Sequence, residues 1–204
     1  MIEDTNTEID LFEDDFGFLV AEGRIRDIAD ELEELHYRHG SHFIWQLKVI
    51  TSHPSFYSIK GEDNIFTTGG ESGDDYDNLL NAARKAVEHG YRVFILPNPK
   101  GIRTADFIFE RKGVYKMFDL KTIIGKSSVG NRLLESIGQT NHVILNMATD
   151  YDPRKLATDL RMYFETNNQA REVLIMKGNK FLSVSRQFVE GKDYFKMFMK
   201  RFLR

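Results

Sequence analysis

The sequence predicts an α/β protein in which a central sheet, antiparallel in part, is flanked by helices. Short apolar runs bounded by Gly and Pro indicate strands, and other segments place apolar residues at helical spacing. An apolar fraction of 41% with 16 Phe is sufficient for a buried core. Cysteine is absent, which excludes disulfides, thiolate metal sites and a cysteine nucleophile.

The first third of the chain is acidic and weakly patterned. Residues 24–38 carry apolar side chains at helical spacing and predict a helix that ends at Gly40. The apolar run 42–50 is short enough to be either a strand or a buried helix. Residues 52–75 contain repeated glycines and predict loops, with room for a short strand. We therefore divide the chain into an acidic N-terminal extension, 1–75, and a second domain, 76–204.

The second domain has clearer periodicity. Residues 76–89 predict a helix that stops at Gly90, and residues 91–97 predict a strand that ends at Pro97. Two further strands, 104–110 and 114–122, surround a turn that contains Gly113. The remaining predicted elements are a helix at 129–138, a strand at 142–147, a helix at 153–167, strands at 172–177 and 180–186, and a helix from about residue 192.

Charge is distributed unevenly along the chain. Residues 1–79 contain 5 Lys and Arg against 19 Asp and Glu, whereas residues 80–204 contain 23 against 12. This asymmetry indicates nucleic-acid binding by the basic part or an acidic tail, unless the two parts simply neutralise each other in one fold. No run approaches the ~18 apolar residues of a membrane span. The acidic N-terminus has no secretory signal, so we expect a soluble, cytoplasmic protein without a membrane partner.

The hairpin at 104–122 brings charged residues together. If residues 111–114 form the loop and Glu110 pairs with Tyr115, the same register places Asp106 opposite Asp119. Side chains alternate along a strand, so Lys121 shares the face of both acids.

Opposed carboxylates destabilise a strand pair unless a cation lies between them. Mg²⁺ takes oxygen ligands and keeps part of its shell for water and substrate phosphates. The pattern is typical of a site that hydrolyses a phosphodiester, with Asp106 and Asp119 holding the metal and Lys121 placed to bind phosphate or to orient the attacking water. The alternative is a solvent-facing strand with an ordinary Asp–Lys pair.

In their order, these residues resemble a known nuclease superfamily. A helix, a strand, ADFIF with Asp106, FDLKT with Asp119 and Lys121, and a helix bearing Gln139 are similar to the PD-(D/E)xK nucleases. The lead-in HGYRVFILP and the ADFIF…DLKT hairpin most resemble the C-terminal tRNA-cleaving toxin domains of bacterial contact-dependent inhibition systems. The resemblance covers residues 76–150 and implies a restriction-endonuclease-like αβββαβ core that binds Mg²⁺ or Mn²⁺.

The resemblance also implies further site residues. Relatives often carry an acid on the first core helix, for which Asp77 is the positional candidate and Glu71 an upstream alternative. Gln139 is expected to face the catalytic pocket. Nucleic acid is expected at the segment that follows the active strand and at one residue of the next helix, which are Lys126, Ser127, Ser128 and Arg132. A capping serine on an ordinary exposed helix is the alternative there.

The predicted function is a metal-dependent endonuclease that cleaves RNA in preference to DNA. A toxin-like role implies an inhibitor or immunity protein as partner, and delivery into another cell. The alternatives are a DNA endonuclease of the same superfamily and a catalytically inactive nuclease-like binding module. The basic, Phe- and Met-rich tail from residue 192 is interpreted first as a helix that packs on the sheet; a membrane-surface helix and a nucleic-acid-binding helix are the alternatives.

Overall fold

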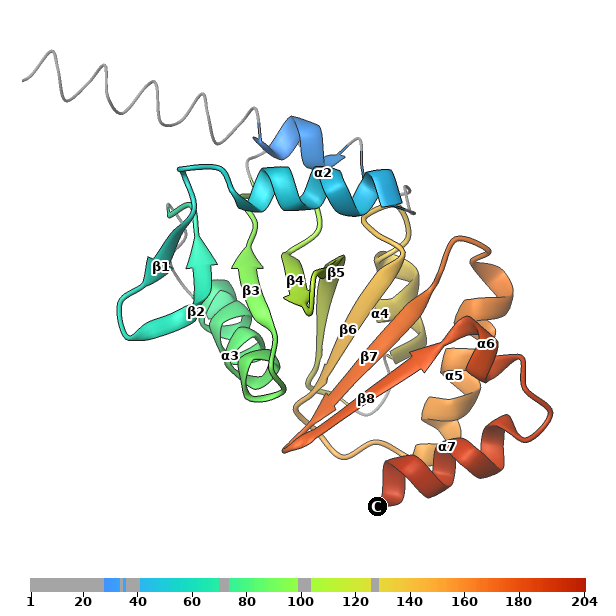
Figure 1. Ribbon diagram of the computed structural model, residues 1–204. Coiled ribbons are helices and arrows are strands. Elements are labelled where there is room, and N and C mark those ends of the chain that lie inside the picture. Colours follow the sequence, from blue (N-terminus) through green and yellow to red (C-terminus); the bar gives the residue numbers. More distant parts are fainter. Residues whose placement is uncertain (1–27, 34, 36–40, 70–73, 99–103, 126–128) are drawn as a thin grey trace, which may run out of the picture.

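The structure, a computed structural model, describes residues 28–33, 35, 41–69, 74–98, 104–125 and 129–204. Within these residues an eight-stranded sheet has its strands in chain order (Figure 1). The strands are β1 (Tyr57–Ile59), β2 (Glu62–Thr67), β3 (Arg92–Ile95), β4 (Phe107–Arg111), β5 (Val114–Ile123), β6 (His142–Met147), β7 (Glu172–Lys177) and β8 (Lys180–Ser185). The predicted α/β class with a mixed sheet is thus confirmed.

Three helices connect the parallel strand pairs. β2 and β3, β5 and β6, and β6 and β7 are parallel, and the other neighbours are antiparallel. Parallel neighbours require a crossover connection, and these are α3 (Asp74–Glu88), α4 (Val129–Glu135) and α5 (Pro153–Thr166). The other helices are α2 (Ser41–Thr51), α6 (Arg186–Val189) and α7 (Tyr194–Leu203), and residues 28–33 and 35 are also helical.

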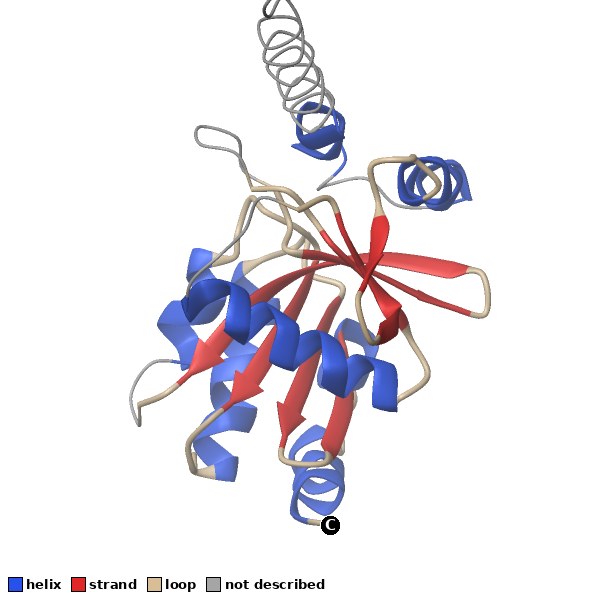
Figure 2. Ribbon diagram, turned by 90° about the vertical axis from the view of Figure 1, so that its left-hand side faces the viewer, coloured by secondary structure: helices blue, strands red, loops and turns tan. Residues whose placement is uncertain are grey.

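Helices cover both faces of the twisted sheet (Figure 2). The first face carries α3, whose alanines pack on β2, β3 and β4. The second face carries α2 and the helical residues 28–33 and 35 over β3 to β5, and α4, α5 and α7 over β5 to β8. None of the helices in the described segments combines the length and apolar character that a membrane span needs.

The segment 41–67 differs from its predicted form. Residues 42–50, ambiguous in sequence, belong to helix α2. The stretch 52–75, predicted as loops with room for a short strand, contains two strands, β1 and β2, and Ile65 of β2 is fully buried. Gly61 and Gly69 have positive φ and mark turns that flank β2, so the glycines indicated the turns and not the strand between them. Because β2 pairs with β3, one sheet spans the expected division at residue 75.

The central hairpin has the predicted register. Phe107 pairs with Phe118 and Glu110 with Tyr115. The connection is shorter than the expected four-residue loop: Arg111 pairs with Val114, and only Lys112 and Gly113 form the turn, both with positive φ. Two consecutive left-handed residues match the twist of an antiparallel pair. Shortening the loop by one residue at each end leaves every other pair unchanged.

Candidate active site

Asp106 lies at the entrance of β4, immediately before its first residue. Its N–H donates to the carbonyl of Phe118 at 3.0 Å, the residue that already pairs with Phe107. Its carboxylate Oδ2 then accepts from the N–H of Leu120 at 2.6 Å. The Asp106 carboxylate therefore accepts the N–H hydrogen bond that a backbone carbonyl would accept if β4 extended further. The carboxylate is fixed by the backbone of β5 and not by a flexible side chain.

Asp119 lies where β5 changes its partner. Residues of β5 up to Phe118 pair with β4, and residues from Asp119 onward pair with β6. On the second face, this position lies between the helices packed on β3 to β5 and those packed on β5 to β8. Asp119 nevertheless retains only 2% of its exposure. Its buried position is unusual for a strand carboxylate and requires compensating partners.

Lys121 is the nearest compensating charge. Its Nζ lies 2.9 Å from Oδ2 and 3.1 Å from Oδ1 of Asp119, so the ammonium group contacts both carboxylate oxygens. The lysine side chain is itself only 13% exposed. The two residues are separated by one pleat of β5 and share a face, as the alternation predicts.

Gln139 also reaches Asp119, but not from a helix. α4 ends at Glu135, and the chain turns through Gly138, whose φ is 91°, before β6. The prediction that a helix bears Gln139 was therefore wrong. With its amide nitrogen turned toward the carboxylate, Gln139 donates to both oxygens of Asp119, at 3.2 Å for Oδ2.

The two acids hold protons more tightly than usual. Burial raises the pKa of Asp106, and the Leu120 N–H and the Lys121 charge only partly oppose it. Burial and the charge of Asp106 raise the pKa of Asp119 to about 7, again against Lys121. One lysine cannot neutralise two buried carboxylates, so the pair retains a proton or needs a further cation.

On α3, the charge of Asp75 contributes to the raised pKa of Asp106. Asp75 and the predicted Asp77 are both exposed, but they lie on different stripes of the helix. The helical phase explains the difference. Asp75 precedes Leu79 and Ala82 by four and seven residues, on the stripe that packs on the sheet, and Asp77 lies on the opposite polar stripe. That phase was readable in the sequence.

The remaining predicted residues fall outside the acid pair. Lys126, Ser127, Ser128 and Glu71 lie outside the described residues. Arg132 is exposed on α4 and pairs with Glu135 at 2.8 Å. In the part of the chain that the structure describes, no three His, Cys, Asp or Glu side chains are grouped to hold a metal ion. Asp106 and Asp119 are thus two carboxylates without a third protein ligand among these residues.

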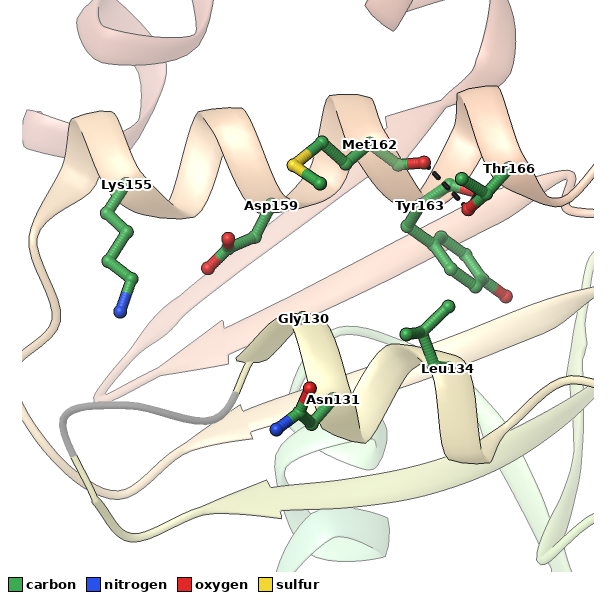
Figure 3. Close-up of a pocket in the computed structure, with 8 residues that line it drawn as sticks. All are labelled: Gly130, Asn131, Leu134, Lys155, Asp159, Met162, Tyr163 and Thr166. Atoms are coloured by element: carbon green, nitrogen blue, oxygen red, sulfur yellow. Dashed lines mark hydrogen bonds between the residues drawn. The ribbon is translucent and has the colours of Figure 1, made fainter.

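A buried polar chain, not predicted from the sequence, lies behind the acids. The Tyr163 hydroxyl is 3.4 Å from Ser136 Oγ and accepts from Asn167 Nδ2 at 3.3 Å. Burial and then the Asp119 charge raise the pKa of Tyr163. The Tyr163 ring also lines a groove of about 260 Å³ between α4 and α5, with Leu134 and Met162 beside it (Figure 3). Neither strand alternation nor helical spacing in the sequence indicates that Tyr163, Ser136 and Asn167 are hydrogen-bond partners.

Comparison with known proteins adds one similarity. No family model and no curated protein matches the sequence. Among solved structures, a chain of the CdiA-CT/CdiI toxin and immunity complex from Burkholderia pseudomallei is similar, at 16% sequence identity and a TM-score of 0.41. The similarity covers 57% of this chain and 92% of that chain. The function proposed below therefore rests on the geometry of the site.

Proposed function

We propose that this protein is a metal-dependent endonuclease that hydrolyses phosphodiester bonds at Asp106, Asp119 and Lys121. The observation that carries the proposal is the buried pair of carboxylates beside a single lysine. Burial without full neutralisation costs folding free energy, and such an arrangement is more typical of reaction sites than of structural ion pairs. A solvent-facing strand with scattered charges would leave Asp119 exposed, and it is 2% exposed.

The donor set fits Mg²⁺ or Mn²⁺. Both carboxyls offer hard oxygen ligands, and their raised pKa values reflect a deficit of positive charge that a divalent ion would remove. Mg²⁺ commonly binds through one or two carboxylates and completes its shell with water and substrate phosphate. Asp106 and Asp119 would therefore hold the ion, with Asp75 near enough to add negative charge. Such an ion supplies Lewis-acid polarisation of the phosphate and lowers the pKa of water.

The protein's own residues have distinct roles in this proposal. Leu120 N–H holds the Asp106 carboxylate in one orientation, and Gln139 does the same for Asp119. Lys121 would position the water nucleophile and offset the negative charge that develops on the phosphate. The segment 126–128, which directly follows the active strand, is proposed to contact the phosphate backbone, together with Arg132.

The proposed family is the PD-(D/E)xK nucleases. The order α3, β3, β4, β5, α4, β6 matches the αβββαβ order of that superfamily, which supports the assignment. The resemblance of the hairpin to tRNA-cleaving toxin domains favours RNA over DNA as substrate. It also implies an inhibitor or immunity protein as partner and delivery into another cell. A DNA endonuclease is the alternative within the same chemistry.

The test is cleavage by matched proteins. Wild type, Asp119→Asn and Lys121→Met are incubated with unfractionated tRNA and with plasmid DNA, in Mg²⁺, in Mn²⁺ and in EDTA. We expect metal-dependent RNA cleavage by wild type and a loss of about 100-fold or more in both variants, since several kcal/mol of charge stabilisation are removed. Lys48→Gln, exposed on α2 and outside the acid pair, controls for the loss of a surface charge. Equal cleavage by all proteins would reject the site.

One observation favours a second candidate, the non-enzymatic binding module. Lys121 already contacts both oxygens of Asp119, which a purely structural ion pair would also do. Titration calorimetry with Mg²⁺ separates the two. Heat that is present in wild type and absent in Asp106→Asn supports the metal site, whereas no binding by wild type favours the module.

A further inference from the structure

The outer surface formed by α5 and α7 is strongly basic, although α7 is already docked. Tyr194, Phe198 and Phe202 of α7 are buried against the second face of the sheet, which confirms that the tail is a packing helix. The opposite side of α7 is exposed. Its cations, with one at the start of the helix and one from α5, are Lys192, Lys196, Lys200, Arg201, Arg204 and Arg161; we call this set the α7 basic surface.

These cations lack carboxylate partners. Across the described segments, the ion pairs of the C-terminal region involve Lys177, Lys116 and Arg186, and none involves the α7 basic surface. Arg161 lies over the Phe195 ring at 4.5 Å, and Arg201 lies over the Phe188 ring at 4.5 Å. A guanidinium stacked on a ring is held in place while its N–H edge can still bind an oxyanion. The surface therefore carries an uncompensated positive charge with part of it fixed.

We propose that the α7 basic surface binds the phosphate backbone of the nucleic-acid substrate, a step that rests on the proposed nuclease function. α7 packs on α5 on the second face of the sheet, the same face that carries Asp119 and Lys121. A backbone held there lies on the side of the molecule where hydrolysis occurs. A folded RNA such as tRNA offers many more phosphates to such a surface than a short oligonucleotide does.

The exposed side of α7 presents charge and little apolar area, which favours nucleic acid over a membrane as its partner. An interfacial helix inserts its apolar face into the lipid, but the apolar face of α7 is already buried against the protein. Of the exposed apolar residues, Phe195 and Met197 are only 37% and 36% exposed, and the Phe195 ring is partly covered by Arg161. Leu203 alone is well exposed, at 62%. Polyanion binding through counterion release needs no such apolar face.

The test compares two triple variants in the full chain. Lys196→Gln/Lys200→Gln/Arg204→Gln removes three cations of the α7 basic surface. Lys48→Gln/Lys60→Gln/Lys112→Gln removes the same charge from three exposed lysines, on α2 and on two hairpin turns. Binding of labelled tRNA is measured by fluorescence anisotropy in EDTA, as a function of salt. Thermal unfolding checks that both variants are folded.

We expect the α7 variant to bind tRNA at least about tenfold more weakly near 0.1 M salt. Its salt slope should fall by about 2, because each lost phosphate contact contributes about 0.7–0.9. The control should bind like wild type. In Mg²⁺, the KM for tRNA should rise while cleavage of a tetranucleotide is unchanged, as a loss of docking predicts.

Several outcomes would overturn the proposal. Unchanged tRNA binding by the α7 variant is one, and equal weakening in the control is another, since that reflects net charge alone. A third is that wild type and the α7 variant bind tRNA equally, while phosphatidylserine vesicles bind wild type and not the α7 variant. That result would make the α7 basic surface a lipid-binding surface. If wild type binds tRNA through the α7 basic surface but never cleaves it, the proposed nuclease function fails and the docking inference stands.

Discussion

Two clusters of polar side chains with buried carboxylates lie on opposite faces of the sheet, and they differ in the number of carboxylates that they contain. On the second face, Asp119 is accompanied by Asp106, and burial raises the pKa of both acids. On the first face, Glu172 at the start of β7 stands alone. Lys116 Nζ lies 2.5 Å from its Oε2, and Ser183 Oγ donates to its Oε1 at 2.5 Å.

The protein compensates the negative charge of Glu172, but it does not fully compensate the charges of Asp106 and Asp119. Burial raises the pKa of Glu172, but the Lys116 charge and the two hydrogen bonds outweigh it, so the net pKa is lowered. Each cluster has one lysine, and the acid pair has twice the negative charge to neutralise. The comparison teaches that a second carboxylate, and not burial alone, creates the demand for another cation. Three predictions test that difference.

The largest expected contrast is in stability. Glu172→Gln leaves Lys116 without its charged partner and should lower the free energy of unfolding by about 1–2 kcal/mol at neutral pH. Because the pKa of Glu172 is lowered in the folded protein, its contribution is present above the unfolded pKa of 4.5. The cost of the substitution should therefore disappear as the pH falls below that value.

Asp119→Asn should show the opposite dependence on pH. The folded pKa of Asp119 is raised from 3.8 to about 7, so the carboxyl stabilises the fold most at low pH and loses that contribution as the pH rises through this window. The variant should gain stability relative to wild type from acid to neutral pH. Urea unfolding at several pH values in EDTA measures both variants. Parallel pH curves for Asp119→Asn and Glu172→Gln would contradict the distinction between the clusters.

The second contrast is the response to metal. Mg²⁺ at about ten times its dissociation constant should stabilise wild type by about 1.4 kcal/mol, which raises the Tm of a domain of this size by a few degrees. Glu172→Gln should respond by the same increment, because its site needs no cation. Asp106→Asn should not respond. Differential scanning fluorimetry with a Mg²⁺ titration measures this, and an equal shift in Asp106→Asn would locate the metal elsewhere.

The smallest expected effect separates the two acids of α3. Asp75→Asn should weaken Mg²⁺ binding several-fold, because the charge of Asp75 acts on Asp106 and is partly screened by solvent. Asp77→Asn, on the opposite stripe of the same helix, is the matched control and should leave the affinity unchanged. Calorimetry at low ionic strength gives both values. A larger loss in Asp77→Asn would restore the acid that helix position first suggested.

The sequence by itself determined the central hairpin. Strand residues alternate between faces, and a short turn fixes the register, so the pairing of Phe107 with Phe118 and the placement of Lys121 on the face of Asp119 followed from local rules. The same rules located α3, α5, β6, β7 and β8 to within a few residues. Local signals were weakest between residues 41 and 67, where an apolar run gave α2 and a glycine-rich stretch gave β1 and β2.

Only the tertiary structure decided how the site is completed. β5 exchanges β4 for β6 at Asp119, Gln139 approaches from a turn after α4, and the Tyr163 hydroxyl approaches from α5. Each of these contacts joins residues that lie far apart in the chain, and no periodicity within one element encodes them. The distinction between Asp75 and Asp77 needed both kinds of information. Helical phase can be read from the sequence, but only the structure shows which stripe of α3 faces the sheet. A hairpin is a local structure, whereas a site between packed helices depends on how the whole sheet is assembled.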